Sequence, residues 1–147
     1  MMQPATLVNR ALLLVFALAA VAFVAYIKPF SPSAPKEAPG QTLRMVSPSE
    51  AAGIIDSVPD TVILDLRTPL EFDQGHIPDA RLLDYNKDDF WKRLASLDRD
   101  KPYVIYCATQ GRSFQTFEKM AALGFAKVWL LQGGFYAWRN AGLPIAH

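Results

Sequence analysis

The sequence predicts an α/β fold in which a mostly parallel sheet carries helices on both faces, and two observations lead to this prediction. From Leu43 onward, short β-rich apolar runs alternate with segments of helical pattern. Such alternation implies right-handed crossovers, which place parallel strands between two helical layers. The chain also has 147 residues, a length typical of a single domain.

Four apolar runs predict the strands. They lie at 62–66, 81–83, 103–106 and 128–131, and each is short enough for a buried strand. In parallel sheets, ligands bind outside the carboxyl ends of the strands. The third run ends immediately before Cys107, so this cysteine is placed where a site is expected.

Capping boxes predict the starts of two helices. In the first, Ser47 and Glu50 flank Pro48 at the first helical position. The second, Thr68-Pro69-Leu70-Glu71, repeats the pattern, and Gly75 ends its helix. The second helix follows the apolar run 62–66, and the first lies just after the start of the alternating region.

Three further helices follow from apolar spacing and glycine stops. One spans 90–97, with apolar residues at helical spacing. Another spans 113–123, and Gly124 ends it. Its predicted apolar face consists of Phe114, Phe117 and Ala121. A last short helix follows Gly133-Gly134 and ends near Gly142.

The N-terminal part of the chain has a different composition. Residues 11–27 are an uncharged apolar run, which Arg10 precedes and Lys28 follows. The run is short for a membrane span and long for the core of a secretory signal. An uncleaved anchor, a cleaved signal and a buried core helix are therefore all open, in that order of preference.

The sequence thus divides into three parts. Residues 1–28 are a transmembrane anchor or signal segment, residues 29–42 a Pro-rich linker, and residues 43–147 the α/β domain. The short tail before the apolar run carries Arg10, and a short basic tail tends to remain in the cytoplasm. We therefore expect a domain anchored by a single pass on the periplasmic or extracytoplasmic side, and a cleaved signal would deliver it to the same side.

Composition excludes several classes of function. The chain has 15 Lys and Arg and 14 Asp and Glu, and Arg10 and Lys28 lie in the first 28 residues. The remainder is nearly neutral, without the basic stripe of a nucleic-acid-binding protein. Cys107 is the only cysteine, which excludes an internal disulfide, and the two histidines do not supply a zinc ligand set.

The segment from Cys107 to Arg112 joins a predicted strand to a helix, and its chemistry suits an anion. Backbone N–H groups at a helix start lack intrahelical partners, and a loop curled over them forms an anion nest. A thiolate at that point is stabilised and reactive. Arg112 adds a cation, and Gly111 is expected to allow a positive φ angle. The alternative is that Cys107 is simply a small buried hydrophobe.

Three segments resemble the rhodanese (sulfurtransferase) superfamily. Cys107 and Arg112, with four residues between them, are similar to its active-site loop. Residues 62–67 with 71–80, which contain Asp65, Arg67 and Gly75-His76-Ile77-Pro78, are similar to a second motif of the family. Residues 131–144 are similar to its closing segment, so the resemblance covers roughly residues 44–145.

The resemblance implies a single-domain enzyme that carries sulfur as a persulfide on Cys107 and needs no metal or organic cofactor. It implies that Ala108, Thr109, Gln110, Gly111 and Arg112 bind the donor. Loops of six residues suit a single sulfur, whereas a loop one residue longer accommodates phosphate or arsenate. The donor is thiosulfate, a persulfide or a polysulfide, and the acceptor is a small-molecule or protein thiol.

Two other functions are open. The domain could be a non-catalytic binding or regulatory module at the membrane, although retention of Cys107 and Arg112 argues against this. It could also be a small phosphatase or arsenate reductase, which the loop length disfavours. For Asp65 and Arg67 we expect a structural ion pair beneath the loop, and for His76 a role in fixing a turn.

Overall fold

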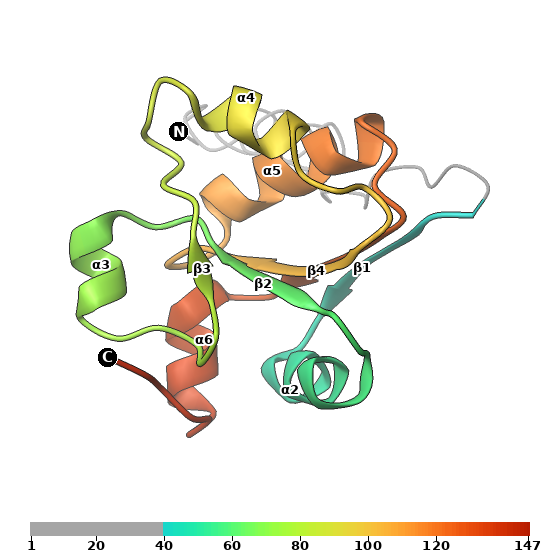
Figure 1. Ribbon diagram of the computed structural model, residues 1–147. Coiled ribbons are helices and arrows are strands. Elements are labelled where there is room, and N and C mark those ends of the chain that lie inside the picture. The colour runs from blue at the N-terminus through green and yellow to red at the C-terminus, as the bar shows by residue number, and fades with distance from the viewer. Residues whose placement is uncertain (1–39) are drawn as a thin grey trace, which may run out of the picture. The chain divides into compact units, whose positions relative to one another are not determined.

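The structure is a computed structural model that describes residues 40–147, and its centre is a five-stranded sheet (Figure 1). The strands are β1 (Thr42–Val46), β2 (Val62–Asp65), β3 (Arg81–Leu82), β4 (Pro102–Tyr106) and β5 (Lys127–Leu131). Their order is β1-β5-β4-β2-β3, and every pairing is parallel. The predicted α/β fold with a parallel sheet is therefore confirmed.

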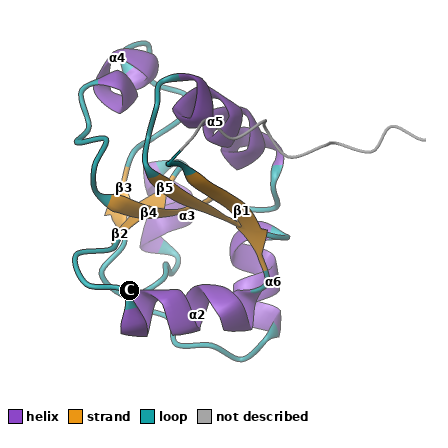
Figure 2. Ribbon diagram, turned by 90° about the vertical axis from the view of Figure 1, so that its right-hand side faces the viewer, coloured by secondary structure: helices purple, strands orange, loops and turns teal. Residues whose placement is uncertain are grey.

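Helices cover both faces of the sheet. They are α2 (Pro48–Ser57), α3 (Pro69–Asp73), α4 (Phe90–Ala95), α5 (Gly111–Ala122) and α6 (Gly134–Asn140). Figure 2 shows α4 and α5 on one side of the sheet and α2 and α6 on the other. Both predicted capping boxes are present at the starts of α2 and α3.

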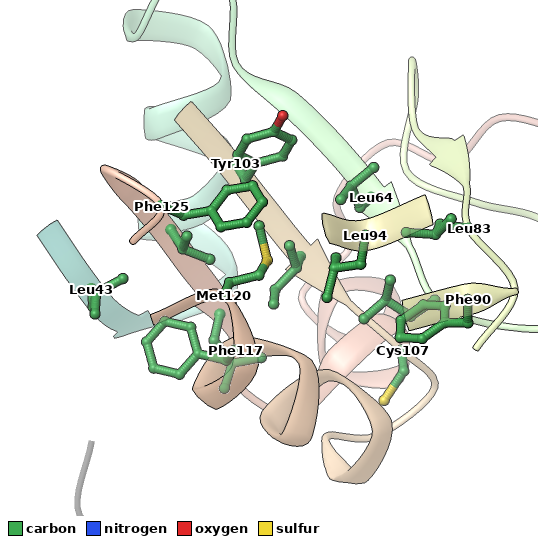
Figure 3. Close-up of a cluster of buried hydrophobic side chains, with 14 residues drawn as sticks. Leu43, Leu64, Leu83, Phe90, Leu94, Tyr103, Cys107, Phe117, Met120 and Phe125 are labelled. Atoms are coloured by element: carbon green, nitrogen blue, oxygen red, sulfur yellow. The ribbon is translucent and has the colours of Figure 1, made fainter. Parts of the chain in front are cut away.

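The two faces of the sheet contain separate hydrophobic clusters, because successive side chains of a strand point to opposite sides. In β4, Tyr103 and Ile105 pack toward α4 and α5, in the cluster that Figure 3 shows. Val104 and Tyr106 belong to the other cluster, with residues of α2 and α6. Cys107 belongs to the first cluster, so its side chain lies on the α5 side of the sheet.

The buried face of α5 includes the predicted apolar residues and extends beyond them. The helix begins at Gly111, two residues earlier than expected, and it buries Ser113, Thr116, Phe117 and Met120. Phe117 of the predicted face is thus buried, and Phe114 and Ala121 are partly buried against the same cluster. The two polar residues can be buried because each hydroxyl is satisfied within the helix start: Ser113 donates to Gln110 O and Thr116 to Arg112 O.

The N-terminal edge of the domain is a strand that the sequence patterns did not predict. β1 pairs with β5 from Thr42 onward. The apolar run 11–27 and residues 29–39 of the linker lie outside the described residues. Within residues 40–147, no helix is long and apolar enough to cross a membrane.

Candidate active site

Cys107 directly follows β4, which lies between β5 and β2 in the sheet. It therefore lies at the carboxyl edge, as predicted. Its side chain is buried, with its sulfur beside the first turn of α5 (Figure 3). The chain then turns through residues 108–110 and enters α5 at Gly111.

The start of α6 holds the carbonyl groups of this loop. The N–H of Phe135 donates to Cys107 O over 2.8 Å, and that of Tyr136 donates to Ala108 O over 3.1 Å. Gly134 allows this approach, because a Cβ atom there would lie 2.5 Å from Thr109 O, 2.8 Å from Ala108 O and closer still to Cys107 O. Three successive carbonyl groups of the loop therefore face α6.

The opposite side of the loop is a row of N–H groups. In a trans peptide the N–H points away from the carbonyl of the preceding residue. The N–H groups of Ala108, Thr109 and Gln110 therefore point away from α6, toward the side where the Cys107 sulfur and α5 lie. Within residues 40–147 they have no protein acceptor, and the free N–H groups of the first turn of α5 adjoin them.

The glycine that shapes the loop is not the one that the sequence suggested. Gly111 was expected to adopt a positive φ, but it begins α5 without one and has open space around it. Beside the loop, the residues with a positive φ are Gly133 (+69°) and Gly134 (+61°), at the start of α6. The loop is held by a neighbouring segment and needs no strained backbone conformation at Gly111.

Gln110 immediately precedes α5, and its backbone and side chain both fit the loop. Its φ is −166°, an extended value that any residue adopts. Its Oε1 accepts from the N–H of Gly133 over 3.2 Å, and its Nε2 lies 3.6 Å from Met45 Sδ. Gln110 therefore ties the loop to the ends of β5 and β1. Of the other predicted donor-binding residues, Ala108 is half-buried, and Thr109 and Gly111 are exposed.

Ser113 contacts the cysteine sulfur, a role that the sequence patterns did not reveal. Its Oγ lies 3.3 Å from Cys107 Sγ and donates to Gln110 O over 3.0 Å. With its hydrogen directed at that carbonyl, the Ser113 oxygen can accept the thiol hydrogen of Cys107. The only available signal was its position in the first turn of the helix that follows the loop.

Arg112 forms a bidentate ion pair with Glu71, which the sequence patterns also did not reveal. Nη2 donates to Oε1 over 2.8 Å and Nη1 to Oε2 over 3.1 Å. The hydrogen bonds from Arg112, together with those from Thr68, lower the pKa of Glu71 from 4.5 to about 2. The hydrogen bonds with Glu71 raise the pKa of Arg112. The predicted cation beside the loop is present, but a carboxylate neutralises it.

Asp65 and Arg67 form a buried ion pair, as expected. Arg67 Nη2 donates to Asp65 Oδ2 over 2.6 Å and to Gly75 O over 2.8 Å. The guanidinium carbon lies 4.0 Å from the ring centroid of Phe135, whose N–H holds the Cys107 carbonyl. Burial opposes the charge of Arg67, but the hydrogen bonds with Asp65 outweigh it and raise the Arg67 pKa. The Asp65–Arg67 pair therefore supports the loop through Phe135.

His76 has the structural role that the sequence suggested. Its ring stacks on Phe72 with a centroid distance of 3.7 Å, and its Nδ1 lies 3.1 Å from Phe72 O. Its backbone pairs with Ala146 through two hydrogen bonds of 2.9 Å. In the part of the chain that the structure describes, no group of three His, Cys, Asp or Glu residues is placed to hold a metal ion.

Comparison with known proteins agrees with this geometry. Residues 47–141 match the rhodanese-like domain family. A sulfurtransferase of Allochromatium vinosum is 38% identical over 86 residues, which cover 58% of this chain and 78% of that protein. The thiosulfate sulfurtransferase GlpE of Pseudomonas syringae is 31% identical over 98 residues, which cover 66% of this chain and 88% of that protein.

Among solved structures, a rhodanese-related protein from Thermoplasma volcanium superposes with a TM-score of 0.62 at 25% identity. The match covers 70% of this chain and 97% of that one. The matched family, the curated relatives and the fold agree. The chain therefore belongs to the rhodanese-like domain family and is a rhodanese-type sulfurtransferase.

Proposed function

We propose that Cys107 accepts a sulfane sulfur from thiosulfate, a persulfide or a polysulfide and passes it to a thiol acceptor. The observation that carries this proposal is the row of N–H groups on the sulfur side of the loop. The start of α6 fixes this row from the other side, where it hydrogen-bonds to two loop carbonyl groups and closely approaches a third. These N–H groups are positioned to bind an anionic sulfur bonded to Cys107.

The reaction has two balanced steps. The Cys107 thiolate attacks the outer sulfur of thiosulfate, a new S–S bond forms, and the old S–S bond breaks. Sulfite leaves with the electron pair of that bond. An acceptor thiolate then attacks the outer sulfur of the Cys107 persulfide, takes it as its own persulfide, and restores the Cys107 thiolate. With a persulfide donor, the group that leaves in the first step is a thiolate.

Phosphate-ester or arsenate chemistry fits the site less well. Those reactions need a protonated acid near the loop to protonate the leaving group. Glu71 is the carboxyl group that contacts Arg112, and its pKa of about 2 keeps it ionised at neutral pH. A purely regulatory module, the other alternative, gives no reason for an ordered N–H row around a single cysteine.

Replacing Cys107 by serine tests the proposal. Cys107→Ser should reduce sulfur transfer to the uncatalysed rate, because no other cysteine exists in the chain. The fold should persist, since the loop is held by backbone groups of Cys107 and Ala108. An assay with thiosulfate and a thiol acceptor, beside a thermal melt, measures both. Transfer by the serine variant would end the persulfide mechanism.

We also propose, from the sequence pattern alone, that residues 11–27 hold the domain at a membrane on the extracytoplasmic side, or direct its export there. Fusions at residue 40 and at the C-terminus to a reporter active only after export should be active. The same fusions to a reporter active only in the cytoplasm should be silent. The reverse result would place the domain in the cytoplasm.

A further inference from the structure

The charges around the loop suggest how the site selects its donor. Residues 108–111 are uncharged, so Arg112 is the cation that the loop contributes. Glu71 meets both terminal nitrogens of Arg112, at 2.8 and 3.1 Å. The Glu71–Arg112 pair therefore presents no net charge beside Cys107, whereas thiosulfate is a dianion.

The capping box of α3 fixes the carboxylate in this place. Oε2 of Glu71 accepts from Thr68 N over 2.9 Å and from Thr68 Oγ1 over 2.8 Å. The carboxylate is thus held by its own helix as well as by Arg112. Arg112 cannot turn both nitrogens toward a bound anion unless it leaves Glu71, and Glu71 cannot follow it without breaking the cap.

We propose that Glu71 determines donor charge specificity: by neutralising Arg112, it disfavours dianionic thiosulfate relative to sulfane donors that carry a single negative charge. This inference rests on the proposed sulfur transfer at Cys107. Glu71 takes no part in the covalent steps and acts through the electrostatic potential at the loop.

Two donors that differ by one charge isolate this effect. Thiosulfate and methanethiosulfonate, CH₃SO₂S⁻, both give their outer sulfur to a thiolate. The same type of S–S bond breaks in each, and sulfite or methanesulfinate leaves with the electron pair. The ratio of kcat/KM for thiosulfate to that for methanethiosulfonate therefore reports the charge preference, and it cancels effects common to both donors.

Glu71→Gln should raise this ratio about fivefold, the size expected for one unit charge at a solvent-screened site. Glutamine preserves the capping box, because its side-chain oxygen can still accept from Thr68 N. Glu50→Gln is the matched control. It changes the same position of the capping box of α2, whose glutamate forms no ion pair with an arginine in the described part of the chain, and it should leave the ratio unchanged.

Two further variants complete a charge cycle. Arg112→Gln should lower the ratio, because the carboxylate then stands alone. The double variant Glu71→Gln/Arg112→Gln restores a net charge of zero and should return the ratio close to that of the wild type. The cycle does not depend on any one variant being fully active, since each ratio compares two donors on the same protein.

The outcomes separate this inference from the proposed function. If the wild type takes sulfur neither from these two donors nor from a persulfide or polysulfide, sulfur transfer at Cys107 is wrong. If both donors react but Glu71→Gln leaves the ratio unchanged, or changes both donors equally, then Glu71 does not determine charge specificity. A double variant whose ratio matches either single variant would also overturn the inference, because net charge would not be the cause.

Discussion

Helices α2 and α3 begin with the same local motif but serve different purposes. Each has a hydroxyl residue at the cap, a proline next and a glutamate that bonds back to the cap N–H, over 2.8 Å at Ser47 and 2.9 Å at Thr68. Glu50 of α2 is exposed, and its hydrogen bonds go to the cap residue of its own helix. Glu71 of α3 also binds Arg112 of the candidate active-site loop.

The order of the strands explains the difference. β2 lies next to β4, with Asp65 opposite Tyr106, so the start of α3 adjoins the loop that follows β4. β1 is separated from β4 by β5, so the start of α2 is one strand further away. The same four-residue motif therefore begins a helix in both places, and its position in the sheet decides whether the motif also serves the site.

Glycine substitutions should give the largest difference in stability between α2, which lies away from the loop, and the segments that contact the loop. Gly134→Ala in α6 should destabilise the protein by roughly 3 kcal/mol or more, because the added methyl group meets three loop carbonyls at a positive φ. Gly53→Ala in α2 should stabilise it by about 0.5–1 kcal/mol, since Gly53 is exposed in a helix interior with open space around it.

Chemical denaturation of both variants measures this contrast. The sulfur-transfer assay should show a loss for Gly134→Ala and none for Gly53→Ala. If alanine at 134 were as harmless as alanine at 53, the close approach of α6 to the loop would not be what holds the N–H groups in place.

The two glutamates should give a smaller, pH-dependent contrast. Glu71→Gln should cost about 1 kcal/mol at neutral pH, a value reduced for the partial exposure of the ion pair. The folded-state pKa of Glu71, about 2, lies below its ordinary 4.5. Its contribution to stability is therefore complete above pH 4.5 and is lost as the pH falls toward 2.

Unfolding free energies of the wild type and Glu71→Gln from pH 7 to pH 2 measure this effect. The difference should narrow between pH 4.5 and 2. Glu50→Gln should show a smaller difference at neutral pH, because exposed Glu50 has only a long-range attraction to Arg44 in place of a bidentate ion pair. A constant difference for Glu71→Gln across that range would mean that its charge is not what stabilises the fold.

Local patterns predicted most of the fold and the position of the loop. Capping boxes and apolar runs placed α2, α3 and the central strands, and the strand that ends at Cys107 placed the candidate nucleophile. Three motifs in order indicated the family. These features depend on residues close in sequence, which is why they could be read without the structure.

Contacts between distant segments could not be predicted in this way. Glu71 and Arg112 are 41 residues apart. The capping box already gave a reason for a glutamate at position 71, so the sequence offered no sign of a second partner. The need for a glycine was assigned to Gly111 within the loop, whereas Gly134, from another segment, is the residue that meets the loop carbonyls. The predicted apolar face of α5 does pack against the core, but the burial of Ser113 and Thr116 beside it was missed, because they satisfy their hydroxyls locally and an apolar periodicity does not register them.

The central claim is that sulfur travels through a persulfide on Cys107, and the mass of the protein tests it most directly. After incubation with thiosulfate or methanethiosulfonate and removal of the donor, the intact protein should gain the mass of one sulfur atom. Peptide analysis should place that sulfur on Cys107, and addition of a thiol acceptor should remove it. Sulfur transfer that proceeds at the full rate while Cys107 never gains mass would contradict the account.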